Sequence, residues 1–117
     1  MEIEHQDCHD FVRVSVRGRV DTAASARLHA ALCSAQELAP EALLLDLTGV
    51  SHFDTSGVAV LVDCVRGLTD SGRRFAIVPS RAVHQALSFV HLNGVFCLYD
   101  RIEDAVRALR KGSEVNH

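Results

Sequence analysis

The most constraining feature of the chain is an apolar strand that leads at once into a capped helix. Residues 43–65 read LLLDLTGVSHFDTSGVAVLVDCV, in which two apolar runs flank a short polar loop and Asp54-Thr55-Ser56-Gly57. Asp54 is a favourable N-cap, and Phe53 and Val58 then occupy the positions of a hydrophobic staple. Two hydroxyls consequently lie in the first helical turn, where free backbone N–H groups and the macrodipole would stabilise a phosphate.

The hydrophobic period changes repeatedly along the chain, which indicates an α/β domain. Alternation over residues 11–17 predicts a half-buried strand, with a weaker strand around Glu2–His5 paired to it. Residues 42–47 are apolar on both faces, as a central parallel strand requires. We therefore expect a mixed four- to five-stranded sheet packed against about four helices, in the order β-β-α-β-α-β-α-β-α. The last expected strand covers residues 95–98.

Length and charge narrow the class of protein. A chain of 117 residues suits a single domain over 1–117, with its core at about 11–110 and a flexible tail at 111–117. The net charge of −3 and the dispersed basic residues argue against direct nucleic-acid binding. The N-terminus is acidic and polar where a signal peptide is basic and apolar, and no apolar run could span a membrane. We therefore expect a cytoplasmic protein that does not insert into membranes.

Catalytic and metal-binding patterns are weak. A serine nucleophile elbow needs glycine where this chain has Asp54, and Ser56 interrupts the Asp-Thr-Gly sequence of an aspartic protease. His5, Cys8 and His9 lie on a weak terminal strand without a recognisable fourth ligand. We therefore expect no enzymatic activity, no metal and no cofactor.

The cysteines and one loop histidine also have simple interpretations. The chain has four cysteines and no Cys-x-x-Cys pair, and three of the four lie in apolar helix or strand patterns, so we expect reduced core residues. His52, beside the Asp54 motif, either tunes the pKa of a neighbouring group or is only solvated. The cysteines are Cys8, Cys33, Cys64 and Cys97.

The element order and two short motifs resemble the STAS domain of bacterial anti-sigma factor antagonists. The resemblance covers the chain from Val12 to about Leu109. Gly18-Arg19-Val20-Asp21 is similar to the family's Gly-Glu-Leu-Asp signature, and Phe53-Asp54-Thr55-Ser56-Gly57-Val58 is similar to its Asp-Ser-Ser-Gly phosphorylation motif. Each tetrapeptide alone is weak, but their spacing and their strand-to-helix contexts agree.

The resemblance implies a switch that a partner kinase operates. Unphosphorylated domains of this family bind an anti-sigma factor, often itself a serine kinase, and so free a sigma factor. Phosphorylation breaks the complex, and a serine phosphatase resets it. The phosphorylated position maps onto Ser56, with Thr55 as the less favoured hydroxyl. The implied partner surface comprises Gly18, Arg19, Asp21, Asp54, Thr55, Ser56, Gly57 and Val58.

Two positions depart from the family pattern. Thr55 replaces the first serine of the phosphorylation motif but keeps a hydroxyl, so phosphorylation remains possible in principle. Arg19 replaces an acidic residue and reverses a charge near the expected partner surface, which bears on the identity of the partner.

Simpler interpretations of the motifs remain open. Asp54–Gly57 could be only a helix cap, and Asp21 only a cap or turn. Gly57 either permits close approach of a partner or neighbouring loop, or relieves crowding beside the strand end. Two other functions also remain, namely a STAS-type regulatory subunit of a membrane lipid or anion transporter, and a scaffold of a sensory assembly.

Overall fold

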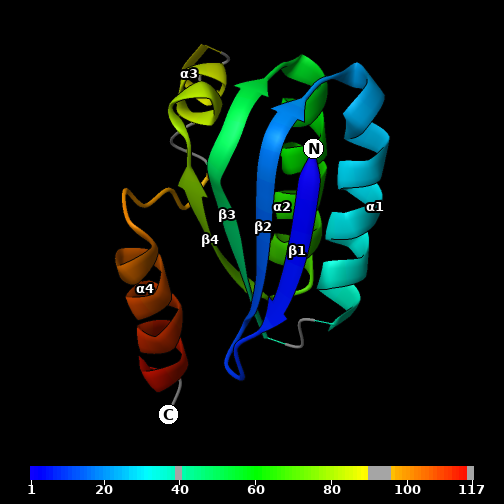
Figure 1. Cartoon of the computed structure of the whole chain (residues 1–117). Coiled ribbons are helices and arrows are strands. Elements are labelled where there is room, and N and C mark those ends of the chain that lie inside the picture. Colours follow the sequence, from blue (N-terminus) through cyan, green and yellow to red (C-terminus); the bar gives the residue numbers. More distant parts are fainter. Residues whose placement is uncertain (39–40, 90–95, 116–117) are drawn as a thin grey trace.

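A computed structural model of the protein describes residues 1–38, 41–89 and 96–115. A mixed β-sheet forms the centre of the molecule, and helices cover both of its faces (Figure 1). The elements are β1 Glu2–Asp7, β2 Val12–Val20, α1 Thr22–Leu38, β3 Ala42–Phe53, α2 Thr55–Asp70, β4 Arg74–Pro79, α3 Arg81–Phe89 and α4 Ile102–Val115.

The four strands lie in the order β1-β2-β3-β4. The β1 strand pairs antiparallel with β2, as the sequence predicts, whereas β2, β3 and β4 run parallel to one another. Parallel pairing brings the carboxyl ends of β2 and β3 to the same edge of the sheet, and helices α1 and α2 begin there (Figure 1). This edge therefore collects the residues that follow both strands.

The core lies on both sides of the central strand β3, as its continuous apolar sequence predicts. Leu43 and Leu45 pack with α1, α2 and α3, while Leu44 packs on the opposite face with α4. All three side chains are fully buried. Each such leucine contributes about 1.5–3 kcal/mol relative to an exposed one, so β3 is a rigid base for the residues at its carboxyl end.

The chain after α3 differs from the sequence prediction. The described part of the expected strand over residues 95–98 forms only an isolated parallel bridge between Leu98 and Ile77, and Val95 lies outside the described residues. The Ile77 N–H donates to the carbonyl of Cys97 and the Tyr99 N–H donates to the carbonyl of Ile77, after which the chain turns into α4. Because α4 packs on the opposite face of the sheet, the segment must leave the edge of β4 after this single contact. The observed order is therefore β-β-α-β-α-β-α-α.

Two further expectations need correction. Helix α4 continues to Val115, so residues 111–115 of the expected tail are helical. Of the four cysteines, only Cys64 belongs to the core; Cys33 and Cys97 are exposed and Cys8 is half-buried, although all four are free. The apolar pattern misplaces Cys33 and Cys97 because a cysteine can occupy the solvent side of a helix or strand whose other residues are buried.

Candidate functional site

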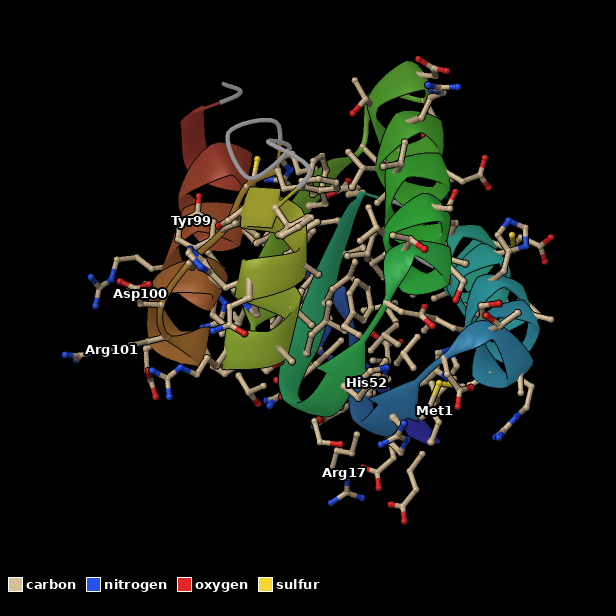
Figure 2. The ribbon with its side chains drawn as sticks, turned by 90° about the horizontal axis from the view of Figure 1, so that it is seen from above. Met1, Arg17, His52, Tyr99, Asp100 and Arg101 are labelled. Atoms are coloured by element: carbon tan, nitrogen blue, oxygen red, sulfur yellow. The ribbon has the colours of Figure 1, made fainter. Side chains whose placement is uncertain are left out.

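The two sequence motifs meet at the carboxyl edge of the sheet. In the parallel register of β2 and β3, Arg19 pairs with His52 and Val20 pairs with Phe53. The backbone N–H of Asp54 also donates to the carbonyl of Val20 at 3.3 Å. Figure 2 looks down on this edge, where His52 is labelled. The backbone thus holds the residues after β2 beside the start of α2.

Most of the first motif is part of a strand. Gly18, Arg19 and Val20 complete β2, and the β2–β3 register shifts between Gly18 and Arg19. Gly18 has a φ of +97°, which a side chain would strain, and this explains glycine at the irregular position. Asp21 then caps α1, since its Oδ1 accepts a hydrogen bond from the N–H of Ala24 at 3.0 Å.

The second motif begins with the predicted N-cap. Asp54 has an extended backbone. Its Oδ1 accepts hydrogen bonds from the backbone N–H groups of Ser56 at 3.0 Å and of Gly57 at 3.3 Å. The Ser56 hydroxyl donates to the same carboxylate oxygen. The sequence predicts the cap, but it does not predict that the cap also binds the candidate phosphoacceptor hydroxyl. One oxygen therefore organises the whole first turn of α2.

The surroundings of Asp54 keep its carboxylate ionised. The hydrogen bond from the Ser56 hydroxyl is the largest cause that lowers the pKa of Asp54. Partial burial opposes it, while the two backbone N–H groups and the nearby His52 lower the pKa further. The site has a negative charge directly beside Ser56 before any modification.

Exposure divides the predicted partner-binding residues into two groups. Arg19 and Thr55 are exposed, and Gly18, Asp21, Asp54 and Ser56 are half-buried. Gly57 and Val58 are buried, so they support the surface from beneath and do not form part of it. The residues that a partner can reach in this conformation are thus Gly18, Arg19, Asp21, Asp54, Thr55 and Ser56.

Gly57 is needed because of its neighbour Phe53. A Cβ atom at position 57 would lie 2.7 Å from Cε1 of the Phe53 ring, and the ring itself is buried in the core. Phe53 and Val58 belong to the same core cluster, as a hydrophobic staple requires. Relief of crowding beside the strand end, one of the two interpretations left open by the sequence, therefore explains the glycine.

Sequence reasoning missed one acidic residue, Asp46, in the middle of β3. Its carboxylate accepts a hydrogen bond from Arg13 Nη2 of β2 at 2.6 Å and another from the Thr48 hydroxyl at 2.6 Å. Burial raises the pKa of Asp46, but these hydrogen bonds and the Arg13 charge outweigh it and leave the pKa below its ordinary value. A single aspartate within an apolar strand is the signal that could have revealed this partly buried ion pair. The ion pair links the side chains of β2 and β3 below the edge where the two motifs meet.

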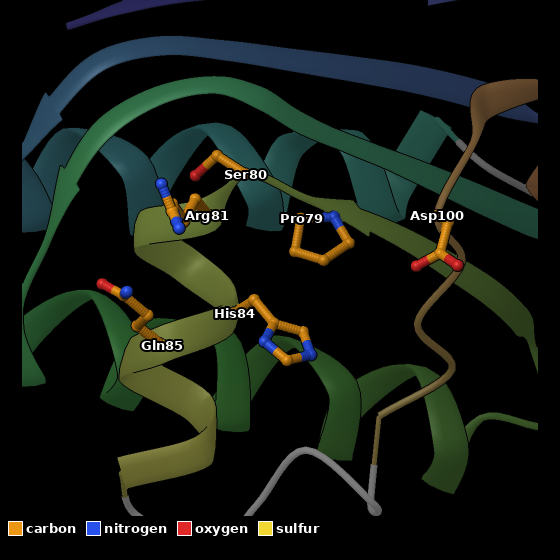
Figure 3. A pocket seen from close by; sticks show the side chains of 6 residues that line it. All are labelled: Pro79, Ser80, Arg81, His84, Gln85 and Asp100. Atoms are coloured by element: carbon orange, nitrogen blue, oxygen red, sulfur yellow. The ribbon is translucent and has the colours of Figure 1, made fainter.

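A separate hollow of about 320 Å³ lies at the end of β4 (Figure 3). Ser80, which lines it, caps α3, because its Oγ accepts a hydrogen bond from the N–H of Val83 at 3.2 Å. Arg81 and Asp100 give the hollow opposite charges. No residue of either motif lines it, so we assign it no part in the site. The lining comprises Pro79, Ser80, Arg81, His84, Gln85 and Asp100.

Two kinds of site are absent from the part of the chain that the structure describes. Within residues 1–38, 41–89 and 96–115, no group of three or more His, Cys, Asp or Glu side chains is arranged to hold a metal ion. Over the same residues, no helix combines the length and the apolar character that crossing a membrane demands.

Comparison with known proteins begins with sequence. The sequence model of the STAS domain matches residues 1–105. A Thermotoga maritima protein described as an anti-sigma factor antagonist is 30% identical over 70 residues, which cover 59% of this chain and 62% of that protein. The match thus spans less than two thirds of that relative's length.

Solved structures extend the likeness to nearly the whole chain. An anti-sigma factor antagonist from Mycobacterium paratuberculosis superposes with a TM-score of 0.85 at 25% identity, over 93% of each chain. Unphosphorylated SpoIIAA of Bacillus shares the fold, with a TM-score of 0.76 at 20% identity over 94% of this chain and 97% of that one. Because the STAS sequence model matches residues 1–105, which include both motifs, and the fold is shared over most of the chain, the chain belongs to the STAS domain family.

Proposed function

We propose that this protein is an anti-sigma factor antagonist that is switched by phosphorylation of Ser56. The observation that carries the proposal is the position of Ser56, which is half-buried in the first turn of α2 with its hydroxyl on the Asp54 carboxylate. Arg19 and His52 lie on the neighbouring strand ends at the same edge. Relatives described as anti-sigma factor antagonists, and the existence of SpoIIAA in phosphorylated and unphosphorylated forms, support this role.

In the unphosphorylated state the reachable surface carries a neutral hydroxyl at position 56. We infer that an anti-sigma factor, which is also a serine kinase, binds this surface in the cytoplasm through Thr55, Ser56 and the adjacent residues Arg19 and Asp21. The complex frees a sigma factor. The chain itself supplies no catalytic group in this scheme, because the kinase transfers the phosphate and a serine phosphatase removes it.

Phosphorylation changes the site in two opposing ways. The Ser56 hydroxyl loses its proton, so it can no longer donate to Asp54, and the phosphate adds a charge of roughly −1.5 to −2 beside that carboxylate. Repulsion between a phosphate of this charge and one carboxylate at about 4 Å in water is about 1.5–2 kcal/mol. The N-terminus of α2 offsets this by about 0.3–1 kcal/mol. The free energy of unfolding should therefore fall by only about 0.5–2 kcal/mol.

The partner interface has no comparable compensation. A surface that is complementary to a neutral hydroxyl leaves the new charge unpaired when the complex forms, which costs several kcal/mol. We therefore expect phosphorylation to dissociate the complex while the domain stays folded.

Mass mapping tests the position of the phosphate. Incubation with a cognate serine-kinase anti-sigma factor and ATP should place one phosphate on Ser56, and Ser56→Ala should abolish it. Ser51→Ala is the matched control, because Ser51 is exposed on β3 outside the motif. Phosphate on Thr55 alone would contradict the assignment. Modification at neither hydroxyl would favour the transporter-subunit or scaffold interpretation.

A pair of isosteric variants tests the electrostatic mechanism. Ser56→Asp and Ser56→Asn have nearly the same shape and differ in charge. We expect Ser56→Asp to weaken partner binding, measured by titration calorimetry, by about 100-fold more than Ser56→Asn, the equivalent of about 2–3 kcal/mol. Ser56→Ala should stay bound and resist switching. Equal affinities of the Asp and Asn variants would refute the charge argument.

A further inference from the structure

Arg19 is an exposed cation at the carboxyl edge of the sheet, where the two motifs meet. Among the residues that the structure describes, its guanidinium has no ion pair and no hydrogen bond. The two earlier arginines of the same strand differ from it. Arg13 Nη2 lies 2.6 Å from Asp46, and Arg17 Nη2 lies 2.9 and 3.0 Å from two glutamates of β1. The fold therefore neutralises two arginines of β2 but not the one at the candidate site.

The carboxylates of the two motifs are already used by helix caps. Asp21 Oδ1 accepts a hydrogen bond from the N–H of Ala24 at the start of α1. Asp54 Oδ1 accepts hydrogen bonds from two backbone N–H groups of α2 and from the Ser56 hydroxyl. Each carboxylate is also stabilised by the N-terminal end of its own helix dipole. Neither of them forms an ion pair with Arg19 in the described chain.

A partner that reaches Ser56 must also cover Arg19. Arg19 pairs with His52 in the parallel register, and the carbonyl of the next residue, Val20, accepts a hydrogen bond from the Asp54 N–H. Adjacent strands lie about 4.8 Å apart, whereas a standard protein interface covers about 800 Å² on each side. Covering a guanidinium without an acceptor is strongly unfavourable. The partner must therefore supply an acceptor for Arg19.

On the basis of the proposed function, we propose that Arg19 is a specificity residue that binds a carboxylate of the anti-sigma factor. An Asp or Glu side chain accepts two parallel N–H···O hydrogen bonds from the planar guanidinium and cancels its charge. A partner that is complementary to an acidic residue at this position would instead bring a like charge to Arg19, which penalises the wrong complex. Arg19 thus selects among anti-sigma factors by their charge.

Titration calorimetry with the serine-kinase anti-sigma factor that modifies Ser56 measures this contact. A non-hydrolysable ATP analogue keeps Ser56 unmodified during the titration. We expect Arg19→Gln to weaken binding about 10- to 100-fold, and Arg19→Glu to weaken it further because two carboxylates then face each other. The melting temperatures of both variants should match that of the unmodified chain.

Arg66→Gln is the matched control. Arg66 is also exposed and, within the described residues, also has no ion pair, but it lies about 15 Å further along α2 than Ser56. Its replacement should change the affinity by less than about twofold, the effect of a charge outside the contact.

A double-mutant cycle then identifies the carboxylate on the kinase. Each exposed Asp or Glu of the kinase is changed in turn to Asn or Gln, and each variant is titrated with the unmodified chain and with Arg19→Gln. One change should weaken binding of the unmodified chain about tenfold or more and have little effect on Arg19→Gln. Replacement of that same carboxylate by lysine should restore binding to Arg19→Glu.

The inference is overturned if Arg19→Gln binds as tightly as the unmodified chain, or if no carboxylate of the kinase is coupled to Arg19. Either result leaves the proposed function intact, because the unmodified chain still binds and is still phosphorylated on Ser56. Failure of the unmodified chain to bind the kinase would overturn the proposed function and this inference together.

Discussion

Replacement of Gly57 by alanine should perturb the start of α2 more than the same change elsewhere in that helix. The added Cβ would lie 2.7 Å from Cε1 and 2.9 Å from Cζ of the buried Phe53 ring. Carbon atoms prefer about 3.5–4.0 Å, so the overlap is about 1 Å. Gly67 is the matched control, because its Cβ would meet Oε1 at the far end of the Gln36 side chain, at 2.9 Å. A flexible amide can move, whereas a ring packed in the core cannot.

The expected difference follows from these neighbours. Both substitutions gain up to about 1 kcal/mol of helix propensity. Only Gly57→Ala also overpacks the core, which typically costs about 1–3 kcal/mol. The unfolding entropy of 117 residues is about 0.25 kcal/mol per kelvin. Gly57→Ala should therefore melt about 4–12 °C below Gly67→Ala.

Thermal denaturation followed by circular dichroism measures the difference, with urea titration to supply the free energy of unfolding. A third variant, Phe53→Leu, tests the cause, because combining it with Gly57→Ala should recover about 1 kcal/mol relative to the sum of the single changes. Equal melting temperatures for Gly57→Ala and Gly67→Ala, or strict additivity with Phe53→Leu, would refute the argument that the ring fixes position 57.

Three other substitutions test the cap, the partly buried ion pair of Arg13 and Asp46, and the proposed partner surface. Asp54→Ala should lower the free energy of unfolding by about 0.5–2 kcal/mol in urea titrations, with Asp54→Ser, which retains a cap oxygen, as control. Because folding lowers the pKa of Asp46, its contribution to stability is present at neutral pH and is lost as the pH falls below the ordinary value of 3.8. The melting temperature of Asp46→Asn should therefore decrease less between neutral and acidic pH than that of the unmodified chain. An equal decrease in both proteins would contradict this. Arg19→Glu should change partner affinity while the free energy of unfolding moves by less than about 0.5 kcal/mol, and a variant that instead loses stability would assign Arg19 a structural role.

Local patterns in the sequence determined much of the fold and the position of the candidate site. The apolar run at 42–47 indicates the central strand, and Asp54 indicates the start of α2, because periodicity and capping depend on residues close together in the chain. The staple of Phe53 and Val58 follows from the same spacing. These features place Ser56 in the first turn of α2 without any tertiary information.

Only the tertiary structure decided the contacts between residues far apart in the chain. It placed Gly18, Arg19 and Val20 at the end of a strand, with Arg19 paired to His52. It also paired Asp46 with Arg13 and brought Asp63 of α2 to the His29 of α1. Such pairs depend on strand register and helix packing, which arise from the arrangement of the whole core, whereas capping and periodicity are properties of short segments.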